Sequence, residues 1–146
     1  ANIKNAIKFV NIYETEEVSV DIKATKNLTG RDLVNGEFKF DLYKADANFA
    51  IEQVIDDNVK VVKVDANTGI VTFATQTFGA VGNYYFVLLE DESNGAGVKI
   101  DTHIYEIEIT VTDNGAGKLV AEIKVDGNKV TGAIEDTIVF NNKYTR

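Results

Sequence analysis

Three polar side chains occupy positions where the hydrophobic alternation of the sequence points inward. Lys26 continues the apolar face of residues 18–24, and Asn142 continues that of residues 138–140. Glu90 is next in register after the apolar residues 84–88. Because side chains alternate between the two faces of a strand, this pattern predicts that all three lie in the core. An isolated polar group would be costly there, so we expect the three to contact one another.

This set of side chains can form a covalent bond. A Lys amine in an apolar site loses its proton because burial disfavours the cation, and the neutral amine is a nucleophile. A carboxylic acid with a raised pKa can hydrogen-bond the Asn carboxamide, polarise its carbonyl and pass protons to the departing ammonia. The predicted product is an isopeptide bond between Lys26 and Asn142, formed once, with Glu90 as the catalytic acid. Tyr84, Phe86 and Phe140 are the predicted apolar wall of the site.

Each of these residues also has an ordinary structural interpretation. Lys26 could reach solvent from a strand end before the turn at residues 27–30. Glu90 could be solvated beside the acidic residues 91–92, and its strand is apolar on both faces, so parity cannot choose a face. Asn142 could belong to a C-terminal tail. Asn141 is its nearest competitor for the bond, although parity places Asn141 on the outer face. The pattern alone leaves both interpretations open.

The segments that carry these residues have the pattern of strands. Period-two alternation is common and helical periodicity is weak. We predict strands over residues 17–25, 37–42, 59–64, 69–78, 83–90, 104–111, 119–125 and 134–140, separated by turn-rich segments. Residues 46–58 have the weakest strand pattern and are predicted to hold a helical turn. Many short strands between frequent turns indicate an all-β, immunoglobulin-like sandwich.

Composition narrows the possible functions. The chain has 146 residues, a net charge of −8 and no Cys, and this length fits one domain with a single core. The lack of Cys excludes disulfides, thiolate metal ligands and thiol catalysis. A single His (His103) leaves no room for a His-rich metal site or a self-contained Ser-His-Asp triad. The acidic excess argues against nucleic acid or an anionic membrane as a partner. We expect no metal, no cofactor and no enzymatic turnover.

A short motif that occurs twice indicates that the chain comes from a tandem array of domains. Residues 7–13 and 138–144 both fit the pattern I-x-F-x-N-x-Y, 131 residues apart (138 minus 7). That separation is too long for a solenoid but suits domains that each end in the same strand. We therefore predict that residues 1–13 are the C-terminal strand of a preceding module or a linker. Residues 14–146 would then form the domain itself.

Several short motifs resemble the streptococcal pilin isopeptide-linkage domain, the repeating module of Gram-positive pilins and long surface adhesins. They are ATKNL at 24–28, GRDL at 30–33, GEFKF at 36–40, GNYYF at 82–86 leading to Glu90, Tyr105 with its strand, and IVFNN at 138–142. The resemblance implies an inverse immunoglobulin-like sandwich, similar to Cna protein B-type domains, with the first and last strands adjacent and parallel. It places the family's reactive Lys on Lys26, its Asn on Asn142 and its catalytic acid on Glu90.

The motifs and the resemblance together predict a self-crosslinked stalk module of a Gram-positive pilin or surface adhesin. A bond from residue 26 to residue 142 closes 116 residues (142 minus 26), which the chain-entropy model values at about 4.7 kcal/mol. The expected partners are neighbouring modules of the same polypeptide, on the cell-wall-anchored extracellular surface. The main alternative is a module that binds a host protein or glycan. A hydrolase with paired carboxylates is a third hypothesis, for which the sequence shows no motif.

Overall fold

The part of the chain that the computed structural model describes, residues 15–91 and 97–145, is almost entirely β-structure. Its strands are β1 (Val18–Val20), β2 (Lys23–Thr29), β3 (Lys39–Ala45), β4 (Ile51–Lys60), β5 (Val62–Lys63), β6 (Thr68–Thr72), β7 (Gln76–Phe78), β8 (Gly82–Glu90), β9 (Val98–Lys99), β10 (Tyr105–Asp113), β11 (Leu119–Val125), β12 (Asn128–Lys129) and β13 (Val139–Tyr144). A single helical turn, α1 (Ile134–Thr137), precedes β13. The predicted all-β class is confirmed.

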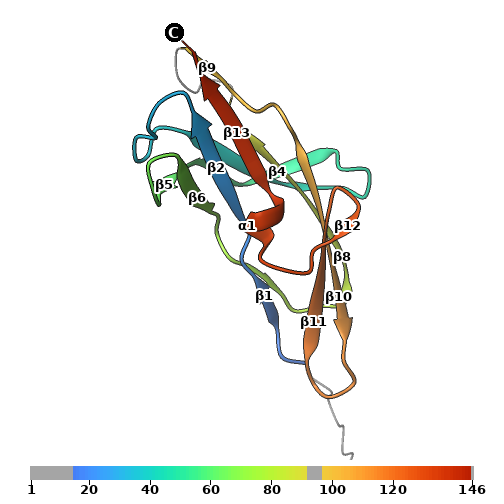
Figure 1. The fold of residues 1–146 in the computed structure, drawn as a ribbon. Coiled ribbons are helices and arrows are strands. Elements are labelled where there is room, and N and C mark those ends of the chain that lie inside the picture. Colours follow the sequence, from blue (N-terminus) through green and yellow to red (C-terminus); the bar gives the residue numbers. More distant parts are fainter. Residues whose placement is uncertain (1–14, 92–96, 146) are drawn as a thin grey trace, which may run out of the picture.

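Two sheets form the sandwich (Figure 1). One has the strand order β12-β11-β10-β8-β3-β4, the other β5-β6-β2-β13-β9, and β1 pairs separately with β7. Strand β13 runs parallel to β2, with Phe140 opposite Lys26 and Asn142 opposite Leu28. This is the parallel pairing of an early and the last strand that the resemblance implies. The pairing of β2 with β13 therefore brings residues from the two ends of the domain side by side.

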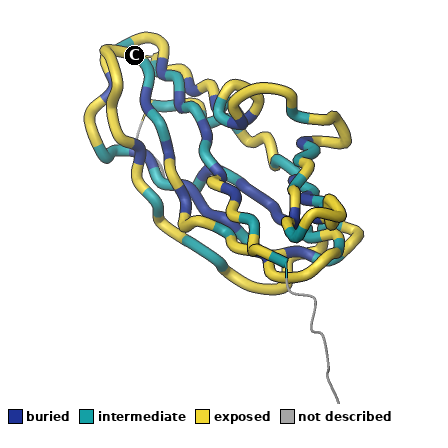
Figure 2. The backbone as a smooth tube through the Cα atoms, turned by 90° about the horizontal axis from the view of Figure 1, so that it is seen from below, coloured by how far each residue is buried: buried dark blue, intermediate teal, exposed yellow. Residues whose placement is uncertain are grey.

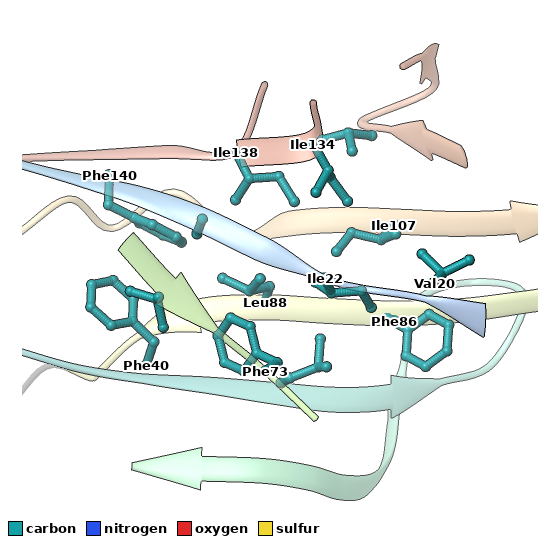
Figure 3. Packing of buried hydrophobic residues seen from close by; sticks show 14 of the residues in the cluster. Val20, Ile22, Phe40, Phe73, Phe86, Leu88, Ile107, Ile134, Ile138 and Phe140 are labelled. Carbon is teal, nitrogen blue, oxygen red and sulfur yellow. The ribbon is translucent and has the colours of Figure 1, made fainter. Parts of the chain in front are cut away.

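Alternation along the strands builds the core. Along β2 the side chains of Ala24, Lys26 and Leu28 are buried, while the residues between them are only partly covered. Figure 2 shows the same alternation of buried and exposed positions along the chain. Hydrophobic residues of both sheets meet between them, with Phe40 and Phe140 toward one end of the core in Figure 3 and Phe86 and Val20 toward the other. The polar cluster must fit into this apolar interior.

The prediction of a helical turn within residues 46–58 is wrong. Strand β4 occupies Ile51–Lys60 and pairs with β3 at the edge of its sheet. Most of its residues are exposed, and its pairing with β3 contains register shifts. An edge strand that is solvated on both faces needs no hydrophobic alternation, so its sequence lacks the period-two signal.

Several predicted strands have different limits in the structure. The segment predicted at 59–64 is divided between the end of β4 and β5. The segment predicted at 134–140 begins with the helical turn α1, and β13 starts only at Val139. Ile134 and Ile138 are both buried, and their spacing of four suits a helical turn as well as a strand. The run at 17–25 is divided between β1 and β2, which belong to different sheets, and the run at 69–78 is divided between β6 and β7.

The two ends of the described domain lie at opposite poles (Figure 1). Glu16 bridges to Lys118 beside the β10–β11 hairpin at one pole, and β13 ends at the other. The first I-x-F-x-N-x-Y copy, at residues 7–13, lies outside the described residues, so the division into 1–13 and 14–146 stays a prediction. Within the described ranges, no helix is long and apolar enough to cross a membrane.

Candidate functional site

A Lys, a Glu and an Asn meet in the core between the two sheets. Lys26 comes from β2 and Asn142 from the adjacent β13, whereas Glu90 ends β8 in the facing sheet. The parallel register of β2 and β13 directs Lys26 and Asn142 to the same face. The three residues are 0%, 4% and 2% exposed, in the order Lys26, Glu90, Asn142. The structure thus brings together the three residues that the sequence pattern selects.

The Glu90 carboxylate links the other two side chains. Its Oε1 lies 3.1 Å from Lys26 Nζ, and its Oε2 accepts a hydrogen bond of 2.5 Å from Asn142 Nδ2. Asn142 Oδ1 accepts a hydrogen bond of 2.7 Å from the backbone N–H of Asp101. Among the described residues, no buried side-chain nitrogen or oxygen lacks a hydrogen-bond partner. The cluster therefore meets the requirement that buried polar groups be satisfied.

Burial changes the acid–base behaviour of Lys26. Removal from water lowers the pKa of its amine from 10.5 to about 8, and the nearby Glu90 charge and hydrogen bond offset part of that effect. A pKa near 8 leaves about a tenth of the amine neutral at pH 7, against less than a thousandth at the ordinary value. The geometry thus provides a reactive amine next to a proton acceptor.

Aromatic rings surround the cluster. Lys26 Nζ lies 4.6 Å from the ring centroid of Phe38. The rings of Phe40 and Phe140 are 5.1 Å apart, Phe40 pairs with Glu90 across β3 and β8, and Phe140 pairs with Lys26 across β13 and β2. Tyr105 packs edge-on against Phe140 at 5.1 Å. These rings keep water from the amine and account for its lowered pKa.

Two residues of the predicted apolar wall lie elsewhere. Tyr84 packs against Phe78, with ring centroids 4.4 Å apart, and its hydroxyl donates to the backbone carbonyl of Ala80. Phe86 also contacts Phe78 and lies at the opposite end of the core from Phe140 (Figure 3). The reason is distance along β8, since these residues stand six and four positions before Glu90. We assign the wall to Phe38, Phe40 and Phe140.

Asn141, the competitor for the bond, lies on the exposed face of β13. Its side-chain oxygen accepts a hydrogen bond from Asn27 Nδ2 at 3.0 Å. Asn141 and Asn142 therefore point to opposite sides of the sheet, as adjacent strand residues do. The Asn142 side chain hydrogen-bonds Glu90 in the core, whereas the Asn141 side chain hydrogen-bonds Asn27 on the outer face.

A cavity of about 330 Å³ lies beside the cluster. Glu90 and Asp101 belong to its lining, together with residues at the end of β8 and in the β9–β10 loop. Phe38, Phe40 and Asp101 are residues of the site that the sequence pattern did not identify as such. The two Phe residues do alternate inward in the sequence, but nothing local in the sequence links their strand to Glu90. Asp101 lies in a loop, where no strand or helix periodicity in the sequence could mark it as a site residue.

The fold and the buried cluster define a β-sandwich module with an internal Lys–Glu–Asn site. Residues 22–145 match the family model of the Spy0128-like isopeptide containing domain (FctA), and this match covers most of the chain. The chain therefore belongs to the family of Spy0128-like isopeptide containing domains. A comparison with curated proteins found no match.

Solved structures that are similar to this chain include major pilins of Streptococcus pyogenes. The T-13 major pilin protein from Streptococcus pyogenes is 19% identical, with a TM-score of 0.51 over 90% of this chain and 55% of that chain. The major pilin from Streptococcus pyogenes is 21% identical, with a TM-score of 0.47 over 85% of this chain and 50% of that chain. The chain spans about half the length of these pilins.

Proposed function

We propose that this chain is a structural module of a Gram-positive pilus or surface adhesin, crosslinked by an isopeptide bond between Lys26 and Asn142. The observation that carries the proposal is that one buried carboxylate contacts both prospective partners through different oxygens. Membership in a family of isopeptide containing domains supports it. The alternative function, ligand binding, does not account for this buried cluster.

The contacts suggest an order of proton transfers. Lys26 first passes a proton to Glu90 Oε1, which leaves a neutral amine and a neutral acid. The Nζ lone pair attacks Asn142 Cγ and forms a tetrahedral intermediate with its negative charge on Oδ1. Glu90 then protonates Nδ2 and accepts a proton from Nζ, the Cγ–Nδ2 bond breaks, and ammonia leaves. Lys26 and Asn142 end as a secondary amide, and Glu90 ends with the proton that Lys26 gave up first, which it then loses to the released ammonia or to solvent.

Ammonia needs an exit from an otherwise closed core. The cavity that Glu90 and Asp101 line would give it a route to solvent. Its departure makes the reaction effectively irreversible at cellular dilution, so each molecule reacts once. Proximity between groups held by a rigid core supplies most of the acceleration.

The position of the bond fits a load-bearing role. It would join β2 to β13, so a force entering near the first strands and leaving at the last would pass through a covalent link. The strands between residues 26 and 142 would be shielded from extension. Neighbouring modules of the same polypeptide would continue this load path.

Intact mass spectrometry of the folded protein tests the proposal. We expect the mass of the sequence minus one ammonia, and the full mass for Lys26→Ala and Glu90→Ala. Asn141→Ala is the matched control, since it removes the exposed neighbour of Asn142, and it should keep the ammonia loss. A folded wild-type sample with the full mass would contradict the proposal. The lack of Met and Cys removes the commonest oxidative mass changes.

A further inference from the structure

A single loop residue, Asp101, contacts the carbonyl end of the prospective electrophile. It lies between β9 and β10, and its backbone N–H donates to Asn142 Oδ1 at 2.7 Å. Glu90 Oε2 holds the other end of the carboxamide, through Nδ2. Each end of the Asn142 amide thus has a partner of the complementary kind, which fixes its orientation toward Lys26.

The Asp101 side chain holds its own backbone in place. Its Oδ2 accepts the backbone N–H of Asn141 at 2.9 Å, and its Oδ1 accepts the backbone N–H of His103 at 3.0 Å. The first bond ties the loop to β13, and the second closes a turn within the loop. The carboxylate therefore clamps the donor N–H against the strand that carries the electrophile.

We propose that the backbone N–H of Asp101 is the oxyanion donor for isopeptide bond formation and that the Asp101 carboxylate is its positioning group. This inference rests on the proposed function. During attack by Lys26, negative charge develops on Asn142 Oδ1, the atom that this N–H already contacts. A preorganised donor aimed at that atom stabilises the transition state more than the ground state.

The rate of bond formation distinguishes a positioning role of Asp101 from a role that depends only on its charge. Its negative charge raises the pKa of Lys26 and so opposes formation of the neutral amine. If charge alone mattered, neutralising Asp101 would accelerate the reaction. If positioning of the N–H matters, the same change slows it, and the sign of the effect separates the two roles.

Refolding kinetics provide the test. Protein recovered unfolded and unreacted from inclusion bodies is diluted from urea, quenched at intervals and assayed by intact mass for ammonia loss, while circular dichroism follows folding. The chain has neither Pro nor Cys, so slow prolyl isomerisation and disulfide formation do not complicate the record. We expect bond formation in Asp101→Ala to be about 10- to 100-fold slower after folding is complete. Asp101→Asn, which keeps one acceptor oxygen, should be intermediate.

Asp46→Ala is the matched control. Asp46 Oδ1 also accepts two backbone N–H groups in a turn, those of Asn48 and Ala50, but at the β3–β4 connection rather than at the cluster. It should react at the wild-type rate. If Asp101→Ala fails to fold, the near-isosteric Asp101→Asn carries the test alone.

Two results would overturn the inference, and they are distinguishable. Wild-type or faster bond formation in folded Asp101→Asn, with bond formation intact in the wild type, would exclude the positioning role and leave the proposed function standing. Absence of ammonia loss in the folded wild-type protein would remove the proposed function and this inference with it.

Discussion

Lys26 is a fully buried amine, and its environment both costs stability and prepares it to react. Burial lowers its pKa to about 8, which corresponds to about 3 kcal/mol against the charged form. The pKa of about 8 already includes the opposing effect of the Glu90 carboxylate, whose Oε1 lies 3.1 Å from Nζ. In the proposed product the amine is a neutral amide nitrogen and the penalty for charge disappears. The reaction would thus remove the cost of burying a charged amine, and the same burial makes the amine reactive.

The lowered pKa of Lys26 predicts a pH dependence in an unbonded variant. In Glu90→Gln the charge of Glu90, which raises the pKa of Lys26, is gone, so this pKa should fall below the value of about 8 that it has beside Glu90. Between pH 8 and 10.5 the unfolded chain then binds the Lys26 proton and the folded chain does not. Stability should therefore rise with pH across this window, by about 3 kcal/mol.

Urea unfolding at several pH values measures this effect. The double variant Lys26→Met/Glu90→Gln is the control, because it lacks the amine and leaves the other titrating groups in place. The difference between the two stability profiles should grow from pH 8 to 10.5. Parallel profiles would show that Lys26 titrates normally in the fold.

The sequence predicts the burial of Lys26 and Asn142 because strand alternation determines which face each side chain takes. Lys26 and Asn142 each end an alternating run on a strand with one buried face, so parity decides their direction. Glu90 ends a strand in which Phe86, Val87 and Leu88 are all buried, and parity carries no information there. Its direction follows only from the pairing of β8 with its neighbours.

At the scale of elements, the parallel pair β2–β13 is what makes the cluster possible. Five consecutive residue pairs, from Val139–Thr25 to Lys143–Thr29, fix its register. A slip of one residue would turn Asn142 to the outer face and Asn141 inward. The chemistry is therefore sensitive to the ends of these two strands.

Gly30 controls one of those ends. It follows β2 with a φ of +93°, and an added Cβ would lie 2.1 Å from the backbone oxygen of Tyr144 in β13. Gly30→Ala should destabilise the unbonded Lys26→Ala protein by more than the roughly 1–3 kcal/mol of backbone strain alone. In the wild-type background it should also slow the ammonia loss, because the strand ends must separate.

Gly127→Ala is the matched control for Gly30→Ala. Its φ is +81°, but an added Cβ meets no atom within 4 Å. It should show the strain cost only and no effect on bond formation. Equal stability losses and equal rates for the two variants in thermal melts and mass assays would contradict the role given to Gly30.

The elements that sequence failed to predict are those whose stability comes from tertiary context. Strand β4 is largely exposed, so nothing in its own pattern identifies it. The turn α1 places Ile134 and Ile138 in the core with a spacing that fits two kinds of structure. Strand limits shift where the chain crosses from one sheet to another, as it does between β1 and β2.

At the scale of the whole molecule, the proposed load-bearing role depends on where the chain enters and leaves the domain. The strands nearest its two ends leave at opposite poles (Figure 1). The proposed bond would connect β2 to β13 across the intervening sequence. A string of such modules would transmit force through covalent links at each domain, as a shaft requires.

Forced extension through the termini tests that arrangement. The wild-type module should show no unfolding step for residues 26–142, since the bond bypasses them. Glu90→Gln should unfold with a length gain of about 400 Å, for 116 released residues (142 minus 26) at about 3.5 Å each. Single-molecule force spectroscopy on tandem repeats of each form makes the comparison. A wild-type step of that size would contradict the load path.

A tryptic map of the folded wild-type protein tests the central claim most directly. If Lys26 and Asn142 are joined, cleavage after Lys26 is blocked, and residues 24–31 remain attached to residues 130–143 as one branched peptide lacking one ammonia. Fragmentation should place the junction on Lys26 and on Asn142 rather than Asn141. Recovery of the two peptides as separate linear species, with cleavage after Lys26, would contradict the account.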